Sequence, residues 1–328
     1  IFFKVPVYSE IEYDLGLNKL EELKKVDFLT VNENDKSIIF KKGFINLSKS
    51  LIIPGGFTVS VFEGTTIDLL EGSSIISKST LQLLGSKDSP IIIKTSDETG
   101  EGIIVSNADS TSKIQNVVFK KLKNNRKYGL NTTGAITFYN SDILMDGVIF
   151  ETINAEDSLN IVNSNFNIIN SKFYNSLSDA IDIDFSDGIM KNIKLINIGN
   201  DALDFSGSNS QLFNINIEKS GDKGISVGES SNLKVKDIEI KKSYIGLAIK
   251  DDSVIKGRKI KVQNSYVGIA NYNKKSWFGG GNAKLNEVII LNTENKYFNE
   301  EGSLMNINNF QIVPNQKKLF NKLYVPEN

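Results

Sequence analysis

The stretches AIDID (180–184), ALDFS (202–206), GISVG (224–228), GLAIK (246–250) and GIANY (268–272) begin at a constant step of 22 residues. SLNIV (158–162) lies one step before the first of them, and AITFY (135–139) lies 23 residues before that. Between them runs a second recurring phrase, for example FNIINSKFYNS and LFNINIEKSGD, in which apolar and polar residues alternate with period two. This alternation indicates β-strands, and the Gly, Asn, Asp and Ser at the joins indicate turns. The chain is therefore predicted to be a stack of short β units.

A unit of this length with two or three short strands and no helix fits one coil of a parallel β-helix, in which each coil lies about 4.8 Å above the last. We expect a single all-β solenoid at residues 44–310, between an N-terminal cap at 1–43 and a C-terminal tail at 311–328. The cap contains the one plausible amphipathic helix, with Leu15, Leu17, Leu20 and Leu23 near one face. The tail carries two prolines and is expected to pack along the outside or to fray.

The composition excludes several kinds of chemistry. The chain has 328 residues, no Cys and no His, so thiol nucleophiles, His bases and His- or Cys-ligated metals are ruled out. The 38 basic and 39 acidic side chains nearly balance, which argues against a nucleic acid partner. No apolar run reaches the roughly 18 residues of a membrane span, so no membrane insertion is expected. The oligomeric state stays open.

The entry segment 51–96 and the later coils resemble the right-handed parallel β-helix proteins of the pectin-lyase-like superfamily, over roughly residues 44–310. This resemblance implies a right-handed, single-stranded β-helix. It also implies an extracellular or envelope setting, so we expect a secreted or cell-surface protein. The sequence starts at IFFKVPVYSE, without Met, as a mature or trimmed chain would.

Alternation within each coil separates core positions from positions that we expect to face solvent. Ile181, Leu203 and Ile225 belong to the predicted core. The predicted outward positions form three columns: Asp182, Asp204, Ser226, Ala248 and Ala270; Asp184, Ser206, Gly228, Lys250 and Tyr272; and Asp179, Asp201, Lys223, Ile245 and Val267. Stacked Asp residues repel one another unless a cation, a lysine or a ligand lies among them. The columns therefore predict a mixed-charge patch, although Asp at coil corners and Asp neutralised by Lys is also ordinary β-helix surface.

The phrases SDAIDID, NDALDF and DKGISVG resemble the successive-coil motifs of calcium-dependent polysaccharide lyases, in particular pectate lyases. The resemblance implies Ca²⁺ as an optional cofactor, with Asp179, Asp201 and Asp204 as metal ligands and Asp182 or Asp184 nearby. It also implies a catalytic group made of Lys223, Lys250 and Asp204. The sequence departs from the family at the position of the base lysine, which is Ser226 here, so Lys223 or Lys250 would have to replace it.

The segment NYNKKSWFGGG (271–281) interrupts the period and holds the only Trp of the chain. Binding loops of solenoids occur at such excursions. The predicted substrate-binding residues are Asp182, Glu229, Tyr272, Lys274, Lys275 and Trp277.

Three functions remain open at this point. The first is action on an acidic polysaccharide by elimination or by C5 epimerisation, both of which begin with abstraction of the C5 proton. The second is hydrolysis by a pair of Asp residues, although the His and the Arg-x-Lys pair that usually accompany them are absent. The third is a non-catalytic adhesin, spike or scaffold module that binds glycan or protein.

Overall fold

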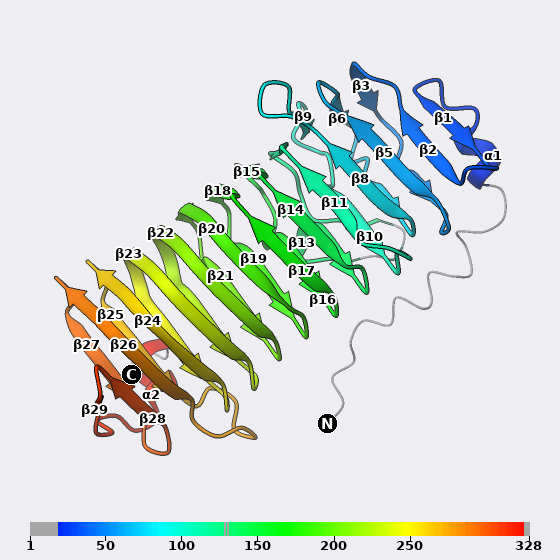
Figure 1. Ribbon diagram of the computed structural model, residues 1–328. Coiled ribbons are helices and arrows are strands. Elements are labelled where there is room, and N and C mark those ends of the chain that lie inside the picture. The colour runs from blue at the N-terminus through cyan, green and yellow to red at the C-terminus, as the bar shows by residue number, and fades with distance from the viewer. Residues whose placement is uncertain (1–18, 128, 130, 325–328) are drawn as a thin grey trace.

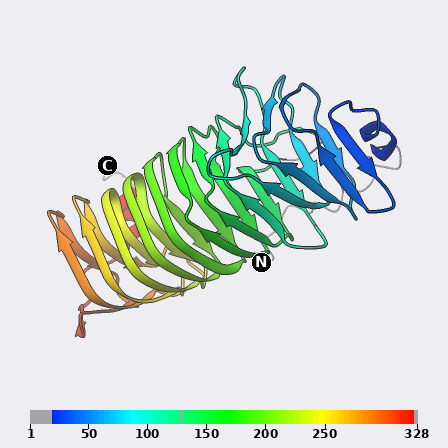
Figure 2. The same cartoon turned by 45° about the horizontal axis from the view of Figure 1, so that its top comes forward.

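The computed structural model describes residues 19–127, 129 and 131–324, and it forms a β-solenoid of about 12 turns (Figure 1). Helix accounts for only about 3% of the chain. The strands of successive turns lie side by side in one continuous 29-stranded sheet that wraps around the core, as Figure 2 also shows. We name its three sides faces A, B and C.

Face A contains β4 (Leu51–Ile53), β7 (Ile75–Ser77), β10 (Ile103–Ser106), β13 (Gly134–Tyr139), β16 (Asp157–Val162), β19 (Asp179–Asp184), β21 (Leu203–Ser206), the last parts of β22 (Asn209–Gly228) and β23 (Asn232–Lys250), β25 (Val267–Tyr272) and β27 (Asn295–Asn299). Face B contains β2 (Ser37–Phe40), β5 (Thr58–Phe62), β8 (Thr80–Leu84), β11 (Ser112–Gln115), β14 (Ile143–Asp146), β17 (Asn165–Ile169), the first parts of β20 (Asp187–Ile198), β22, β23, β24 (Val254–Gln263) and β26 (Asn282–Leu291), and β28 (Leu304–Ile307). Face C contains β3 (Phe44–Leu47), β6 (Thr66–Leu69), β9 (Ile91–Lys94), β12 (Val117–Lys120), β15 (Ile149–Glu151), β18 (Lys172–Ser176), and the parts of β20, β22, β23, β24 and β26 that follow the corner from face B.

All pairings within these faces are parallel, and antiparallel pairs occur only at the two ends of the described chain. At the N-terminal end, α1 (Lys19–Leu23) and β1 (Leu29–Asn32) precede the solenoid, and β1 pairs with β2. At the C-terminal end, β29 (Phe310–Gln311) pairs with β28, and α2 (Leu319–Tyr324) follows. These segments give the open sheet edges partners, which limits edge-to-edge association.

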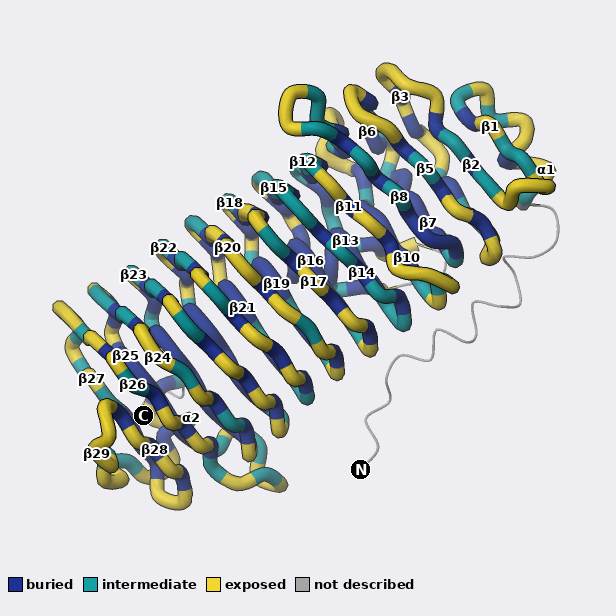
Figure 3. The backbone as a smooth tube through the Cα atoms, viewed as in Figure 1, coloured by how far each residue is buried: buried dark blue, intermediate teal, exposed yellow. Residues whose placement is uncertain are grey.

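The core consists of the inward columns that alternation predicted. Ile181, Leu203, Ile225, Leu247 and Ile269 are all fully buried and lie in register on successive coils. Figure 3 shows the alternating burial along the strands. Aromatic side chains stack in the same way, since Phe150 lies between Phe119 and Phe173 with ring centroids 5.0 and 4.4 Å apart. Each coil therefore buries its apolar side chains on copies of themselves in the next coil.

Polar residues at the corners fix the step between coils. Buried serines form a ladder in which the backbone N–H of Ser164, Ser186 and Ser208 donates to the hydroxyl of the serine one coil ahead, at 3.0 Å in each case. Asn192 and Asn214 have positive φ angles, and their side-chain amides donate to the asparagine one coil back at 2.9 Å. Asn tolerates the left-handed conformation, so these corners can turn tightly.

The ends differ in part from the sequence-based expectation. Helix α1 is short, and the predicted helical positions Leu15 and Leu17 lie outside the described residues. Leu23 is buried, and Leu20 packs against the core. The C-terminal tail forms a helix that packs on face A, beside β25 (Figure 1). This position of the tail changes the functional face.

Candidate functional site

Three outward columns of face A bring together acids that lie 22 residues apart in the sequence. β19 and β21 pair in register, so Asp182 lies opposite Asp204 and Asp184 lies opposite Ser206. One coil earlier, Asp157 lies opposite Asp179 and Asn160 lies opposite Asp182. We call the resulting cluster the acidic patch, which consists of Asp157, Asp179, Asp182, Asp184, Asp201 and Asp204.

The carboxylates at the strand starts are held by the backbone of the next coil. The N–H of Asp201 donates to Asp179 Oδ1 at 2.9 Å, and the N–H of Lys223 donates to Asp201 Oδ1 at 2.9 Å. The Asn160 amide donates to Asp182 at 3.3 Å and to Asp184 at 3.4 Å. One oxygen of each of two acids stays without a hydrogen-bond partner although it is buried, namely Asp157 Oδ2 and Asp204 Oδ1. Such oxygens are costly unless a cation or a ligand compensates them.

The recessed position of the patch favours protonated carboxyl groups. Burial raises the pKa of Asp182 well above its usual range, and the nearby carboxyls of Asp184, Asp157 and Asp204 raise it further. Burial raises the pKa of Asp184 to about 6 and that of Asp201 to about 7. The patch therefore holds carboxyl groups that can act as proton donors near neutral pH.

Lys223 lies at the C-terminal border of the patch and is committed to ion pairs. Its Nζ lies 3.3 Å from both oxygens of Asp201 and also contacts the carboxylate of Asp222. Burial alone lowers the pKa of Lys223, but the carboxylates of Asp201 and Asp222 outweigh this effect and raise it. A lysine that holds its proton so firmly is a poor general base, so Lys223 is better suited to neutralise charge.

Two further lysines approach the patch from the same side. Lys250 is buried, with its Nζ 4.0 Å from Asp204 Oδ1. Lys274 is exposed as a residue, but partial desolvation and the ammonium groups of Lys250 and Lys223 lower its pKa. We call Lys223, Lys250 and Lys274 the lysine cluster. Among its members, Lys274 has the environment that suits a base.

The excursion 273–281 is anchored rather than loose. Asp251 is only 1% exposed, and its Oδ1 accepts the backbone N–H groups of Lys274 and Lys275 at 2.7 and 2.8 Å. The ammonium of Lys275 contacts the carboxylate of Glu229. Trp277 is 63% exposed and lies on the outer part of the excursion. Asp251 thus positions Lys274 and Lys275 on the side of the patch.

The structure corrects one group of predicted outward residues. Ser226, Ala248, Ala270 and Tyr272 were expected to face solvent, but all four are fully buried. The last three belong to an apolar cluster with Leu319 and Leu323 of α2, which covers this part of face A. Tyr272, predicted to bind substrate, is therefore inaccessible in this structure.

The donor set of the patch fits a hard cation. One carboxylate oxygen from each of Asp179, Asp201 and Asp204 lies within 4.8 Å of the others, and Ca²⁺ prefers such oxygen ligands. The unpartnered Oδ1 of Asp204 strengthens this fit. The same three residues are the ligands expected from the resemblance, while Asp184 accepts a hydrogen bond from Asn160. Lys223 competes for the same position, since it already neutralises Asp201.

Sequence reasoning missed Asp157, Asp222 and Tyr324. Asp157 could have been found, because it lies one 22-residue step before Asp179. The hydroxyl of Tyr324 donates to Asp222 Oδ1 at 2.9 Å, and Lys223 Nζ lies 5.4 Å from the centre of the Tyr324 ring. Nothing in the spacing of the repeat signals this contact, because Tyr324 comes from the tail.

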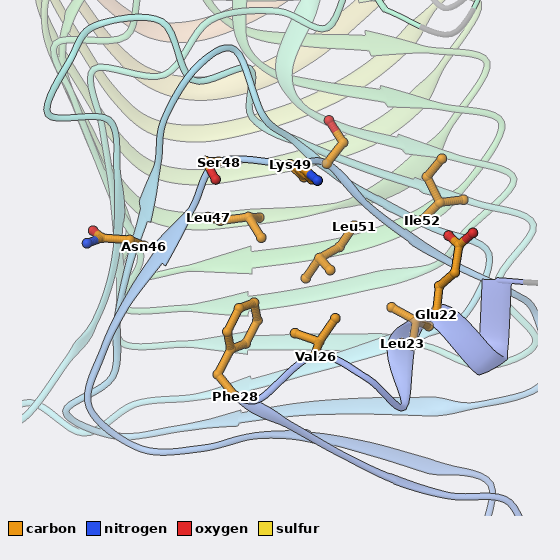
Figure 4. Close-up of a pocket in the computed structure, with 11 residues that line it drawn as sticks. Glu22, Leu23, Val26, Phe28, Asn46, Leu47, Ser48, Lys49, Leu51 and Ile52 are labelled. Carbon is orange, nitrogen blue, oxygen red and sulfur yellow. The ribbon is translucent and has the colours of Figure 1, made fainter.

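Besides a hollow of about 430 Å³ on face B, lined by Phe166, Gly188 and Gln211 among others, the described surface has hollows at the N-terminal cap and beside the strands of the patch. One, of about 310 Å³, lies at the N-terminal cap between α1 and β3–β4 and is lined by Leu23, Phe28 and Leu51 among others (Figure 4). It holds two charged side chains, those of Glu22 and Lys49, and is remote in sequence from the acidic patch. The second, of about 470 Å³, is lined by Glu156 and Leu177, which directly precede the strands of the patch. The second hollow is therefore the one relevant to the site.

Known structures share this fold at low sequence identity. A periplasmic alginate epimerase is 10% identical, with a TM-score of 0.50 over 88% of this chain and 81% of its own. The catalytic domain of a family GH87 α-1,3-glucanase in complex with tetrasaccharides is 11% identical, with a TM-score of 0.47 over 84% of this chain. This chain covers 64% of that domain, somewhat less than two thirds of its length. An endopolygalacturonase from Stereum purpureum complexed with galacturonate is 12% identical, with a TM-score of 0.46 over 83% of this chain and 94% of its own.

No protein-family profile matches the sequence, and neither does any curated protein. The similarity to the epimerase together with the parallel pairing establishes the fold: this chain is a right-handed parallel β-helix protein. The predicted fold class is thus confirmed. Among the described residues, no helix is long and apolar enough to span a membrane. A fold of this kind hosts many activities, so the activity must be argued from the site.

Proposed function

We propose that this chain acts on an acidic polysaccharide at the acidic patch, by elimination or C5 epimerisation of a uronate unit. The observation that supports this proposal most directly is that the lysine cluster and the acidic patch lie next to each other at Asp204. Lys250 Nζ lies 4.0 Å from Asp204, and Lys223 pairs with Asp201 on the adjacent column. The fold similarity to an alginate epimerase agrees with this choice.

The chemistry requires a cation for the uronate carboxylate, a base for the C5 proton and an acid. Lys223 and Lys250 are positioned to neutralise the carboxylate, because both are buried beside the patch. Lys274, with its lowered pKa, is the best candidate for the base. Asp201, with a pKa of about 7, can donate a proton to the glycosidic oxygen in elimination or to C5 in epimerisation.

Ca²⁺ held by Asp179, Asp201 and Asp204 would supply additional charge neutralisation for the substrate carboxylate. In that case Lys223 would shift from Asp201 toward Asp222, which it already contacts. With Ca²⁺ bound, Asp201 would be ionised, so the proton donor would be an acid outside the ligand set, such as Asp182 or Asp184.

Hydrolysis is the second candidate, and one observation favours it. Asp182 and Asp204 lie opposite each other on adjacent coils, and burial raises the pKa of Asp182 well above its usual range, so Asp182 can hold a proton beside a second carboxyl group. This is the arrangement that acid–base hydrolysis of a glycoside needs.

A panel of polyuronates and neutral glucans, assayed with Ca²⁺ and with a chelator, separates these activities. Elimination gives an unsaturated product that absorbs in the ultraviolet, epimerisation in D₂O introduces deuterium at C5, and hydrolysis releases reducing ends without either signal. Lys274→Gln should lower the rate about 10²–10⁴-fold if it is the base. The matched control is Lys284→Gln, because Lys284 is exposed on face B.

Retention of full activity in Lys274→Gln would contradict the assignment of the base. Binding of glycan without any turnover would support the alternative of a non-catalytic surface module. A secreted or envelope location, which the proposed substrate requires, is part of this proposal.

A further inference from the structure

The accessible part of the face A column that holds Asp182 and Asp204 is only two strands wide. On β19 and β21 the outward residues Asp182, Asp184, Asp204 and Ser206 are partly exposed. In the column of Asp182 and Asp204, the next residues toward the C-terminus are Ser226, Ala248 and Ala270, which are fully buried. Toward the N-terminus the same column continues through Asn160, Thr137, Ile104 and Ile76, all of which are 5% exposed or less. This column is therefore bounded on both sides along the axis of the solenoid, whereas the column of Asp184 continues toward the N-terminus through the partly exposed Val162, Tyr139 and Ser106.

Helix α2 forms the C-terminal boundary. Leu319 and Leu323 pack with Ile245, Ala248 and Val267 in one apolar cluster. Three hydrogen bonds fasten the helix: Leu319 N–H donates to Glu300 Oε1 at 2.8 Å, the Tyr244 hydroxyl donates to the Leu323 carbonyl at 3.2 Å, and the Tyr324 hydroxyl donates to Asp222. A polymer lying along the axis would meet α2 immediately beyond Lys223.

The described part of the connection between β12 and β13, residues 121–127, 129 and 131–133, lies on the N-terminal side. Lys127 Nζ donates to the carbonyls of Glu71 and Gly72, in the turn before β7, at 3.2 and 2.6 Å. The segment therefore reaches back past the starts of three successive face A strands, β13, β10 and β7. Its base is closed by the Asn125 N–H, which donates to the Thr132 hydroxyl at 3.1 Å.

The remaining opening fits a short piece of glycan. Two strands at about 4.8 Å spacing span about 10 Å, which is the length of about two sugar units. Beside it, at the strand starts, lies the hollow of about 470 Å³ lined by Lys123, Arg126, Glu156 and Leu177. Leu177 is 64% exposed and offers an apolar surface to a sugar ring, while Lys123 and Arg126 suit a carboxylate.

We propose that the site binds the end of an acidic glycan chain rather than its interior. The terminal uronate lies on the acidic patch, and the next unit leaves sideways through the hollow beside Leu177 and Arg126. This inference rests on the proposed function, because it assumes that the acidic patch binds a uronate. It predicts processing from chain ends and recognition of about three sugar units.

The test is calorimetric binding of uronate oligosaccharides of one to eight units to the full chain carrying Lys274→Gln, the substitution that is expected to slow turnover. Affinity should rise up to about three units and then stay constant. The variant Arg126→Gln should weaken binding of the three-unit ligand about tenfold and leave the one-unit ligand unchanged. The matched control is Arg258→Gln, since Arg258 is exposed on face B.

Affinity that keeps rising with each unit beyond four would show a long groove and overturn the end-binding proposal, while the acidic patch could still be the site. An equal loss for the one-unit and three-unit ligands in Arg126→Gln would also overturn it. If no uronate of any length binds, the proposed function itself fails, and the end-binding proposal falls with it.

Discussion

Replacement of Lys223 by Met should destabilise the chain in a pH-dependent way. The Lys223 side chain is 7% exposed and the Asp201 side chain 4%, and the ammonium lies 3.3 Å from both Asp201 oxygens. Met fills a similar volume but leaves Asp201 buried without its cation. Asp201 can take up a proton once its cation is gone, and because its pKa is about 7 the lost pair costs about 1.4 kcal/mol at pH 8. Since unfolding entropy is about 2.1 cal/mol/K per residue, 328 residues give about 0.7 kcal/mol/K, and Tm at pH 8 should fall by about 2 °C.

The loss should be largest at pH 8 and small at pH 5. At pH 5 Asp201 is protonated in the folded chain, because its pKa is about 7. Removal of Lys223 at this pH therefore leaves no unpaired charge on Asp201. Thermal unfolding followed by circular dichroism at both pH values measures this. Lys223→Met combined with Asp201→Asn should recover most of the stability. Lys259→Met is the control, because Lys259 is 53% exposed and its pair with Asp237 should contribute at most about 1 kcal/mol. Equal losses at pH 5 and pH 8 would refute the reasoning.

Three other predictions follow from the same contacts. The folded chain should lose stability as pH rises through 6 and 7, because Asp184 and Asp201 keep protons that the unfolded carboxyls have released above about pH 4. In urea titrations the free energy of unfolding should fall by up to about 1.4 kcal/mol per pH unit for each group. A rise in stability over this range would contradict the assignment. Asp251→Ala should cost about 2 kcal/mol and open residues 273–281 to protease, whereas Asp252→Ala, at an exposed neighbour with a similar φ, should not. Ca²⁺ should raise the Tm of the wild type and of Asp109→Asn, but not that of Asp204→Asn; equal shifts in all three would place the ion elsewhere.

The fold could be predicted from the sequence because a solenoid repeats its own contacts. The inward column of Ile181, Leu203 and Ile225 is visible as a 22-residue step, and the structure confirms it. The same step placed Asp182 and Asp204 side by side. Repetition turns a long-range contact into a periodic pattern that can be read along the chain.

The rest of the site depends on contacts that do not repeat. Alternation correctly shows that Ala248, Ala270 and Tyr272 point away from the core, but it cannot show that α2 covers them. Likewise, the spacing of the repeat does not reveal that Tyr324 reaches Asp222 and Lys223. Lys223 was correctly predicted to lie beside the acids, and the raised pKa explains why it is a weak candidate for the base.

The central claim is that the acidic patch and the lysine cluster bind the end of an acidic glycan. A crystal structure of the Asp204→Asn variant with a uronate trisaccharide tests it most directly. We predict a terminal uronate ring against Asp182 and residue 204, with its carboxylate near Lys250 or Lys223 and the second unit beside Leu177. The claim would be contradicted by a trisaccharide bound in any of three other places: around Trp277, on face B, or along the axis over a displaced α2.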